Sequence, residues 1–363
     1  MKKHPYRSLP DQAFWRRSIA ECPPEAVDPV GSFELRITPA SRVATAGSCF
    51  AQHIARHLAL SGFCYHVAEP GHPLLPDDVR KEQQYGTFSA RYGNIYTARQ
   101  LRQLLDRALG RFVPVEDAWI EAADKVLDPF RPNVQPGGFV SVAEMRADRA
   151  QHLAAVRRMF ETLDVFVFTL GLTECWASRE DGAVFPVCPG VEGGMFDPER
   201  HVFLNQSVAE VIEDIDYVYA EVRRINPAAQ FILTVSPVPL VATAAPGQHV
   251  LAATTYSKSV LRVAAETLCR AHAAIHYFPS YEIITGSFNR GRYFAADLRS
   301  VTEEGVAHVM RLFLAHAGDS KGGLDVSGTA ARQAAATDFE RLGQALVEVE
   351  CDELALDRPA PKQ

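Results

Sequence analysis

Short apolar segments alternate with longer helix-like segments through most of this chain. The apolar segments have the length of buried strands, and we predict strands at 42–46, 63–67, 164–170, 230–235 and 275–278. The intervening segments repeat their apolar residues at helical spacing, and we predict helices at 51–60, 97–109, 143–163, 206–225, 255–271 and 303–316. This alternation is typical of a mainly parallel sheet covered by helices. It predicts an α/β protein with a three-layer, flavodoxin-like sandwich, in which ligands bind beyond the carboxyl ends of the strands.

Three long segments interrupt this order. They span 69–96, 111–140 and 175–205, and they are rich in proline, glycine and aromatic residues without a clear period. This composition predicts ordered loops. Long loops on an α/β scaffold commonly build its binding site.

The two ends of the chain differ from the middle. We predict an N-terminal extension at 1–32, the α/β domain at 33–317, and a linker, helix and polar tail at 318–363. The tail contains an alanine-rich helical pattern at 329–349, which we expect to contact a protein partner.

Composition limits the classes of function. With a net charge of −7, the chain has no basic surplus that would favour nucleic acid. No apolar run reaches the roughly 18 residues of a membrane span, and the first 20 residues lack a secretory signal, so we expect a cytoplasmic protein. The seven cysteines are scattered without a Cys-x-x-Cys pair, which argues against a disulfide framework or a zinc ribbon.

Gly47, Ser48 and Cys49 lie where the strand predicted at 42–46 turns into the helix predicted at 51–60. The first amides of a helix have no partner within it, and the positive end of the helix dipole favours a thiolate or an oxyanion. A thiol is also intrinsically more nucleophilic than a hydroxyl. We therefore predict Cys49 as a nucleophile, with Ser48 as the alternative.

The run GSCFA at 47–51, together with Thr45, Gln52 and later segments, resembles the GSCFA-domain family, which is grouped with the SGNH (GDSL-like) hydrolases. The resemblance extends over about residues 33 to 315. It implies an acyl-ester hydrolase or O-acyltransferase that forms a covalent acyl-enzyme without a cofactor. The substrate implied is a glycan or another small polar acyl carrier.

Two further segments match the oxyanion-hole blocks of SGNH-like enzymes. At the end of the strand predicted at 164–170, Thr173 stands in the slot of an asparagine and Glu174 in that of an aspartate. Gly93 and Asn94 match the other block. Each segment also fits a plain loop that leads into the next helix or turn. Trp176, close behind Glu174, has an aromatic face that suits a sugar ring.

The resemblance also implies an Asp-x-x-His pair just before the last helix. Asp297 matches the aspartate, but Ser300 replaces the histidine. His249, in the loop after the strand predicted at 230–235, is our predicted substitute, with Asp297 as its partner.

Other groups remain open as alternatives. His53 follows Cys49 by one helical turn, and Lys258 follows a serine at a helix start; His308, on the last helix, is predicted to be structural. His53 and His57 have the i, i+4 spacing of a zinc site, but the glutamate between them and a third ligand are missing, so we predict no metal.

A contrasting interpretation is a non-catalytic protein that binds a glycan or an acyl carrier. Such a protein would keep the fold and lose the chemistry of the site. Ser300 and Thr173 both favour it, because neither is the residue that the catalytic pattern requires.

Overall fold

A four-stranded parallel sheet forms the centre of the molecule. The computed structural model describes residues 4–121, 125–318 and 352–357. The strand order is β1-β4-β8-β9, and all neighbouring pairs are parallel. The strands are β1 (Val43–Gly47), β4 (Val165–Leu170), β8 (Gln230–Val235) and β9 (Ile275–Tyr277). This confirms the prediction of a mainly parallel α/β sheet.

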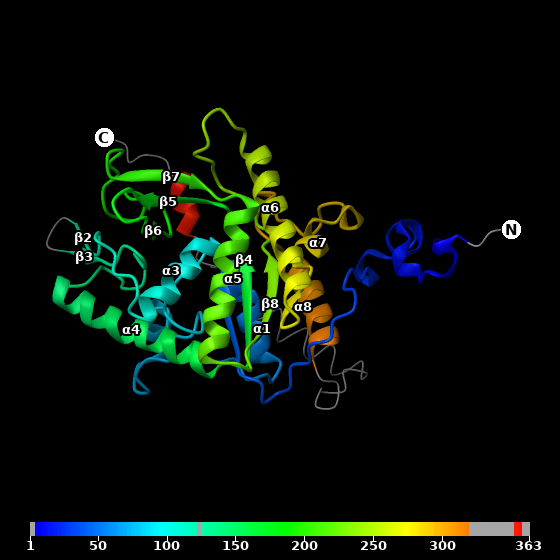
Figure 1. The fold of residues 1–363 in the computed structure, drawn as a ribbon, viewed down its shortest axis with the longest axis horizontal. Coiled ribbons are helices and arrows are strands. Elements are labelled where there is room, and N and C mark those ends of the chain that lie inside the picture. The colour runs from blue at the N-terminus through cyan, green and yellow to red at the C-terminus, as the bar shows by residue number, and fades with distance from the viewer. Residues whose placement is uncertain (1–3, 122–124, 319–351, 358–363) are drawn as a thin grey trace.

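Helices cover both faces of the sheet (Figure 1). Because side chains alternate along a strand, Phe166 and Phe168 pack on one face and Val165 and Val167 on the other. The first face carries α3 (Ala98–Ala108), α4 (Val142–Thr162), α5 (Val208–Ile225) and α6 (Val250–Ala271). The second carries α1 (Phe50–Leu60), α7 (Ser280–Thr285) and α8 (Glu303–Ala317). The three-layer sandwich is confirmed.

Side-chain caps explain where several helices begin. Thr97, Ser141, Ser207 and Thr302 each accept a hydrogen bond from the third backbone amide of the helix that follows. These bonds pair amides that have no partner within the helix. The predicted helices lie within two residues of the observed ends, except that α6 begins at Val250 rather than at 255.

The prediction of a strand at 63–67 was wrong. Only Tyr65 pairs with the sheet, through an isolated bridge to Val43. Two hydrogen bonds hold it there, from the Val43 amide to Cys64 and from the His66 amide to Val43. The Ala68 amide then donates to Ser89, so the chain leaves β1 after a single pair.

The prediction of a loop at 175–205 was also wrong. This segment carries an antiparallel sheet of order β6-β5-β7. Its strands are β5 (Glu174–Ser178), β6 (Val184–Phe185) and β7 (His201–Asn205). Cys175 and Ala177 alternate with Glu174 and Trp176, and the first two are buried against Val184. This period of two is a strand signal that the proline-rich surroundings obscured.

The other two long segments are mostly irregular, with short elements inside them. The first contains α2 (Asp77–Glu82), and the second contains the pair β2 (Trp119–Ile120) and β3 (Val126–Leu127). A 3-10 turn, η6 (Ser287–Asn289), follows α7.

The first and the last described residues lie on opposite sides of the molecule (Figure 1). Short turns η1 (Pro5–Ser8), η2 (Asp11–Ala13), η3 (Arg16–Ala20) and η4 (Pro24–Ala26) precede the sheet. A C-terminal turn, η7 (Asp352–Asp357), lies beside β5. The helix expected at 329–349 falls outside the described residues, and the boundaries at 33 and 317 remain predictions. Within the described ranges, no helix is both long and apolar enough to cross a membrane.

Candidate functional site

Three neighbouring strands end at one small crevice. Ser48, Gly171 and Ser236 are the first residues after β1, β4 and β8, and all three line this crevice. The parallel register aligns the ends, pairing Gly47 with Thr169 and Leu170 with Val235. Cys49, Tyr96, Leu172 and Val238 complete the lining. The crevice therefore lies at the carboxyl edge of the sheet, where α/β proteins bind ligands.

Gly47 makes the turn from β1 to α1 possible. Its φ is +143°, a conformation that side chains disfavour. A Cβ atom at this position would lie 2.4 Å from the carbonyl oxygen of Thr169. Only glycine fits between the two strands here. Ser48 and Cys49 follow it directly and lie at the carboxyl edge of the sheet.

Ser48 and Cys49 are both buried, with 4% and 6% of their surfaces exposed. The Ser48 Oγ has no hydrogen-bond partner. The hydroxyls of Thr169, Thr234 and Ser280 are also buried without a partner, but those residues do not line the crevice and Ser48 does. Cys49 takes the N-cap position of α1, as predicted for a strand-to-helix turn. The crevice thus combines an unpaired hydroxyl with a thiol at a helix N-terminus.

Lys258 lies behind the crevice. Its side chain is almost fully buried, and Nζ donates a hydrogen bond of 2.7 Å to the carbonyl oxygen of Gly171. A protonated Lys258 at this place would favour negative charge in the crevice. The structure therefore joins Lys258, one of the open alternatives, to Gly171 in the wall of the crevice.

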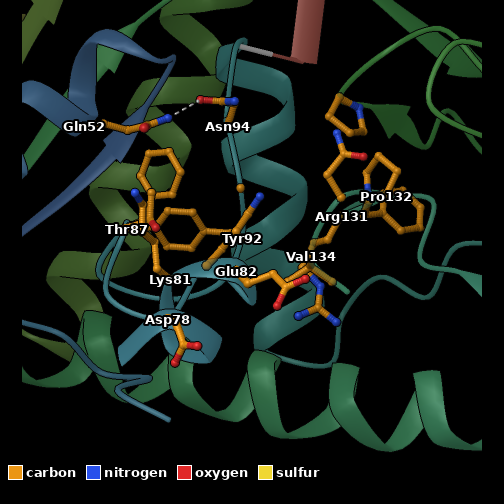
Figure 2. A pocket seen from close by; sticks show the side chains of 16 residues that line it. Gln52, Asp78, Lys81, Glu82, Thr87, Tyr92, Asn94, Arg131, Pro132 and Val134 are labelled. Carbon is orange, nitrogen blue, oxygen red and sulfur yellow. Dashed lines mark hydrogen bonds between the residues drawn. The ribbon is translucent and has the colours of Figure 1, made fainter. Parts of the chain in front are cut away.

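A polar cavity of about 320 Å³ opens beside α1. Gly93 and Asn94 line it with Gln52, which follows Ser48 by about one helical turn. Figure 2 shows Gln52 and Asn94 pointing toward one another, and Gln52 Nε2 donates to Asn94 Oδ1 at 3.4 Å. Charged and polar side chains share the remaining wall with apolar and aromatic ones. The first group is Asp78, Lys81, Glu82, Gln84, Thr87, Arg131 and Asn133, and the second is Phe88, Tyr92, Phe130, Pro132, Val134 and Pro186.

An apolar groove of about 230 Å³ has Tyr96 in its wall. Tyr96 and Leu172 line both the groove and the crevice. Glu174 and Trp176 lie in this groove, away from Gly93 and Asn94. The Glu174 carboxylate accepts hydrogen bonds from Thr243 Oγ1 at 2.7 Å and from the Ala244 amide at 3.4 Å. Burial raises the pKa of Glu174 in spite of these bonds.

Thr173 is fully buried, and its two donors bind elsewhere. Its hydroxyl donates to Asn205 Oδ1 at 2.7 Å, and its amide donates to Ser257 Oγ at 3.1 Å. These bonds join the segment between β4 and β5 to β7 and to α6. Thr173 therefore acts in the structure as a connector between elements.

His249 and Asp297 lie on exposed loops. His249 Nδ1 accepts a hydrogen bond of 3.1 Å from the Leu251 amide and caps α6. Asp297 accepts hydrogen bonds from the Ser300 amide at 2.9 Å and the Ser300 hydroxyl at 2.5 Å. Burial raises the pKa of Asp297, but these bonds outweigh it and lower the pKa overall. Ser300 thus takes the Asp297 oxygens that a histidine would use.

The loop of Asp297 nevertheless lies near the sheet edge. Arg299 Nε donates to the carbonyl oxygen of Pro239 at 3.2 Å. Pro239 directly follows Val238, which lines the crevice. Asp297 therefore lies on a loop that contacts the segment after β8.

Three other histidines that the sequence offered as candidates differ in their surroundings. Burial lowers the pKa of His53 to about 3 and that of His57 to about 4, with the charge of Arg56 adding to both shifts. His308 bridges the Tyr293 hydroxyl and the Val27 carbonyl oxygen, a structural role. The described part of the chain contains no group of three metal-binding side chains.

Sequence reasoning missed Gly171 and Ser236 as site residues. Both follow predicted strands directly, so their positions at the sheet edge were a usable signal. Tyr96, an aromatic residue expected near the rim of the site, is held at the crevice by the Gly171 and Leu172 amides, which donate to its carbonyl oxygen.

The match to a known family extends over this whole arrangement. No curated protein matches the chain. The model of the GSCFA family matches residues 42–313, from the start of β1 into α8. These residues contain the crevice, the polar cavity and nearly all of the apolar groove. The chain therefore belongs to the GSCFA family.

Proposed function

We propose that the crevice is the reaction centre of an acyl-ester hydrolase or O-acyltransferase. One observation carries the proposal: a thiol and an unpaired hydroxyl, on Cys49 and Ser48, share a crevice at the carboxyl edge of the sheet. The apolar groove shares Tyr96 and Leu172 with the crevice, and Gln52, in the wall of the polar cavity, follows Ser48 by about one helical turn. An acyl ester likewise has a polar carrier and an apolar chain.

In this proposal the Cys49 thiolate attacks the ester carbonyl carbon. A carbon–sulfur bond forms, the carbon–oxygen bond to the carrier breaks, and the carrier leaves as an alcohol after gaining a proton. Water or an acceptor hydroxyl then releases the acyl group and restores the thiol. The N-terminus of α1 and the Lys258 side chain favour the negative charges along this path.

The Ser48 hydroxyl is the proposed donor to the oxyanion, together with the Cys49 amide. It is buried and has no partner in the structure, so it can donate without breaking another bond. Thr173 is left out of this donor set because its hydroxyl and amide are already used. Gly93 and Asn94 line the polar cavity, and we assign them to the carrier.

The proposed proton acceptor is His249, with Asp297 as its partner, because both lie on loops that follow or contact the carboxyl edge of the sheet. His53 is disfavoured, because a pKa of about 3 makes its imidazole a poor acceptor for a thiol proton. A thiol depends less on such a base than a serine hydroxyl does.

The proposed carrier is a glycan or another small compound rich in hydroxyl groups. The polar cavity presents carboxylates, a lysine, an arginine and amides within one wall. Such mixed donors and acceptors suit neutral hydroxyl groups better than a single strong charge. Gln52 and Asn94 point toward one another in this cavity, and they offer amide groups to such a carrier (Figure 2).

A second candidate is a non-catalytic protein that binds a glycan or acyl carrier. The bond between Asp297 and Ser300 favours it, because the resemblance to SGNH-like enzymes implies a catalytic aspartate and histidine at these two positions. Both candidates share the cavity and the groove.

Turnover assays separate the two candidates. The protein is incubated with p-nitrophenyl esters and acetylated sugars, with and without sugar acceptors, beside Cys49→Ala and Ser48→Ala. Catalysis predicts ester cleavage or transfer that Cys49→Ala abolishes and Ser48→Ala lowers by about 10²- to 10³-fold, as for loss of one oxyanion donor. Ligand binding without cleavage or transfer would support the binding protein.

A further inference from the structure

The apolar groove has the character of a site for an alkyl chain. Its lining includes Leu172, Trp176, Phe203 and Leu240, and no arginine, lysine or histidine is among the described residues that line it. Glu174 is the one carboxylate there, and its oxygens are bound to Thr243 and Ala244. The groove therefore favours an uncharged, apolar occupant.

The groove begins at the proposed reaction centre. Tyr96 and Leu172 form part of its wall and also part of the crevice that holds Ser48 and Cys49. A ligand that lies along the groove can therefore place one end at the thiol. A neutral ester carbonyl suits that end, while a free carboxylate would meet Glu174 on the same groove wall.

An aliphatic side chain of the same protein already lines the groove. Leu356, on the C-terminal turn Asp352–Asp357, lies among the lining residues, with 41% of its surface still exposed. Figure 1 shows this turn, in red, beside β5. The groove thus accommodates a branched alkyl group that covers only part of it.

We propose that this groove binds the acyl chain of the substrate as an unbranched alkyl chain, with the ester carbonyl at Cys49 and Leu356 displaced from the groove. The inference rests on the proposed function for the position of the carbonyl. It names the substrate class as acyl donors of medium chain length, in preference to acetyl donors. It also makes the C-terminal turn a competitor of the substrate.

A binding measurement tests this without requiring turnover. The probe is methyl 10-bromodecanoate, whose bromine quenches a nearby tryptophan, added to the full-length Cys49→Ala variant so that no thiol reacts at the centre. We expect quenching that saturates, and a Trp176→Phe change in the same background should remove it. Methyl 4-bromobutanoate should bind far more weakly, by about fourfold for each methylene group that the groove no longer covers.

Two leucine variants test the role of the tail. Leu356→Ala should tighten binding of the bromodecanoate ester severalfold, because less apolar surface must be displaced. Leu74→Ala, at an exposed leucine outside the groove, is the matched control and should leave the affinity unchanged.

The outcomes separate this inference from the proposed function. Equal quenching in Trp176→Phe, no dependence on chain length, or no effect of Leu356→Ala would overturn the corresponding part of the proposal. Saturable quenching in a protein without esterase or transferase activity would support the groove and contradict the catalytic proposal. Turnover of short esters without quenching would support the catalytic proposal and contradict the binding of an acyl chain in the groove.

Discussion

Ser48 and Gly171 contact each other across the crevice: a Cβ atom built on Gly171 would lie 3.0 Å from the Ser48 Cβ. The same atom would lie 2.9 Å from the carbonyl oxygen of Tyr96. Gly171 therefore provides the space in which the Ser48 side chain lies. The absence of a side chain after β4 is a requirement of the site.

Gly171→Ala is expected to destabilise the protein by about 1–3 kcal/mol, the usual cost of overpacking. It should also lower ester turnover, because Ser48 or Tyr96 has to move. Gly31→Ala is the matched control, since a Cβ there meets no atom within 4 Å. Chemical denaturation and turnover of both variants provide the test, and equal behaviour would contradict the close packing of the crevice.

His249→Ala tests the proposed proton acceptor. If His249 accepts the proton, turnover should fall by about 10²- to 10⁴-fold. Loss of the α6 cap alone should cost about 0.5–2 kcal/mol of stability without such a fall. His72→Ala is a close control, because His72 is also exposed and its Nδ1 likewise accepts an amide two residues ahead. Unchanged turnover in His249→Ala would remove this residue from the mechanism.

Lys258→Met tests the cation behind the crevice. The change keeps most of the buried side-chain volume and leaves the Gly171 carbonyl oxygen without this donor, at a cost of about 1–3 kcal/mol. Alkylation of Cys49 by iodoacetamide near pH 7 should become slower, because the thiolate loses a favourable charge. Lys125→Met, remote from the crevice lining, should leave the alkylation rate unchanged. A Cys49 rate that does not respond to Lys258→Met would show that Lys258 is only structural.

Cysteines outside the crevice provide a comparison for the iodoacetamide alkylation of Cys49. Burial raises the pKa of Cys175 to about 12 and those of Cys188 and Cys269 to about 11. These three thiols should stay unlabelled near pH 7. Cys64 is exposed and serves as the internal reference for an accessible thiol.

A buried charge cluster supports the polar cavity from behind. Asp128 is fully buried and accepts hydrogen bonds from Arg131 Nε at 3.0 Å and Arg149 Nη2 at 2.9 Å. Burial alone would raise the pKa of Asp128, but the charges of Arg131, Arg149 and Arg107 lower it well below its usual range. Arg131 lines the polar cavity, so this cluster fixes part of its wall.

Asp128→Asn should destabilise the protein by about 3–5 kcal/mol at neutral pH, because buried arginine charges lose their partner. The folded pKa of Asp128 lies below the unfolded value of about 3.9. The contribution of Asp128 to the free energy of unfolding is therefore complete above that value and is lost as the pH falls toward the folded pKa. Chemical denaturation between pH 7 and pH 3 should show that the difference in free energy of unfolding between wild type and variant becomes smaller below about pH 4. Glu161→Gln, in an exposed pair with Arg157, should show a small and nearly constant difference.

The central sheet was predictable because each of its strands is visible as a short apolar segment in the local sequence. β1 and β4 are buried along their whole length, so they read as continuous apolar runs in the sequence. The position of Ser48 and Cys49 between a strand and a helix followed from the same patterns. β5 was missed because its alternating residues lie between proline- and glycine-rich stretches.

The contacts within the site depend on residues far apart in the chain. Lys258 binds Gly171 across 87 positions, and Thr173 binds Asn205 across 32. No local pattern predicts such pairs, because they follow from strand register and helix packing. The resemblance placed Thr173 in an oxyanion slot, but only the structure reveals that its donors are already used. The exposed positions of His249 and Asp297 likewise follow from tertiary packing.

Mass analysis of the protein after brief incubation with p-nitrophenyl acetate and p-nitrophenyl octanoate shows which side chain forms the acyl-enzyme. We expect one acyl group per chain on the peptide that contains Cys49, absent in Cys49→Ala and still formed, more slowly, in Ser48→Ala. The exposed Cys64 should stay unmodified at that time, which separates site chemistry from general acylation. An acyl group on Ser48 would contradict the assignment of Cys49 as nucleophile. No adduct from either ester or from acyl-coenzyme A, together with no turnover, would contradict the catalytic account.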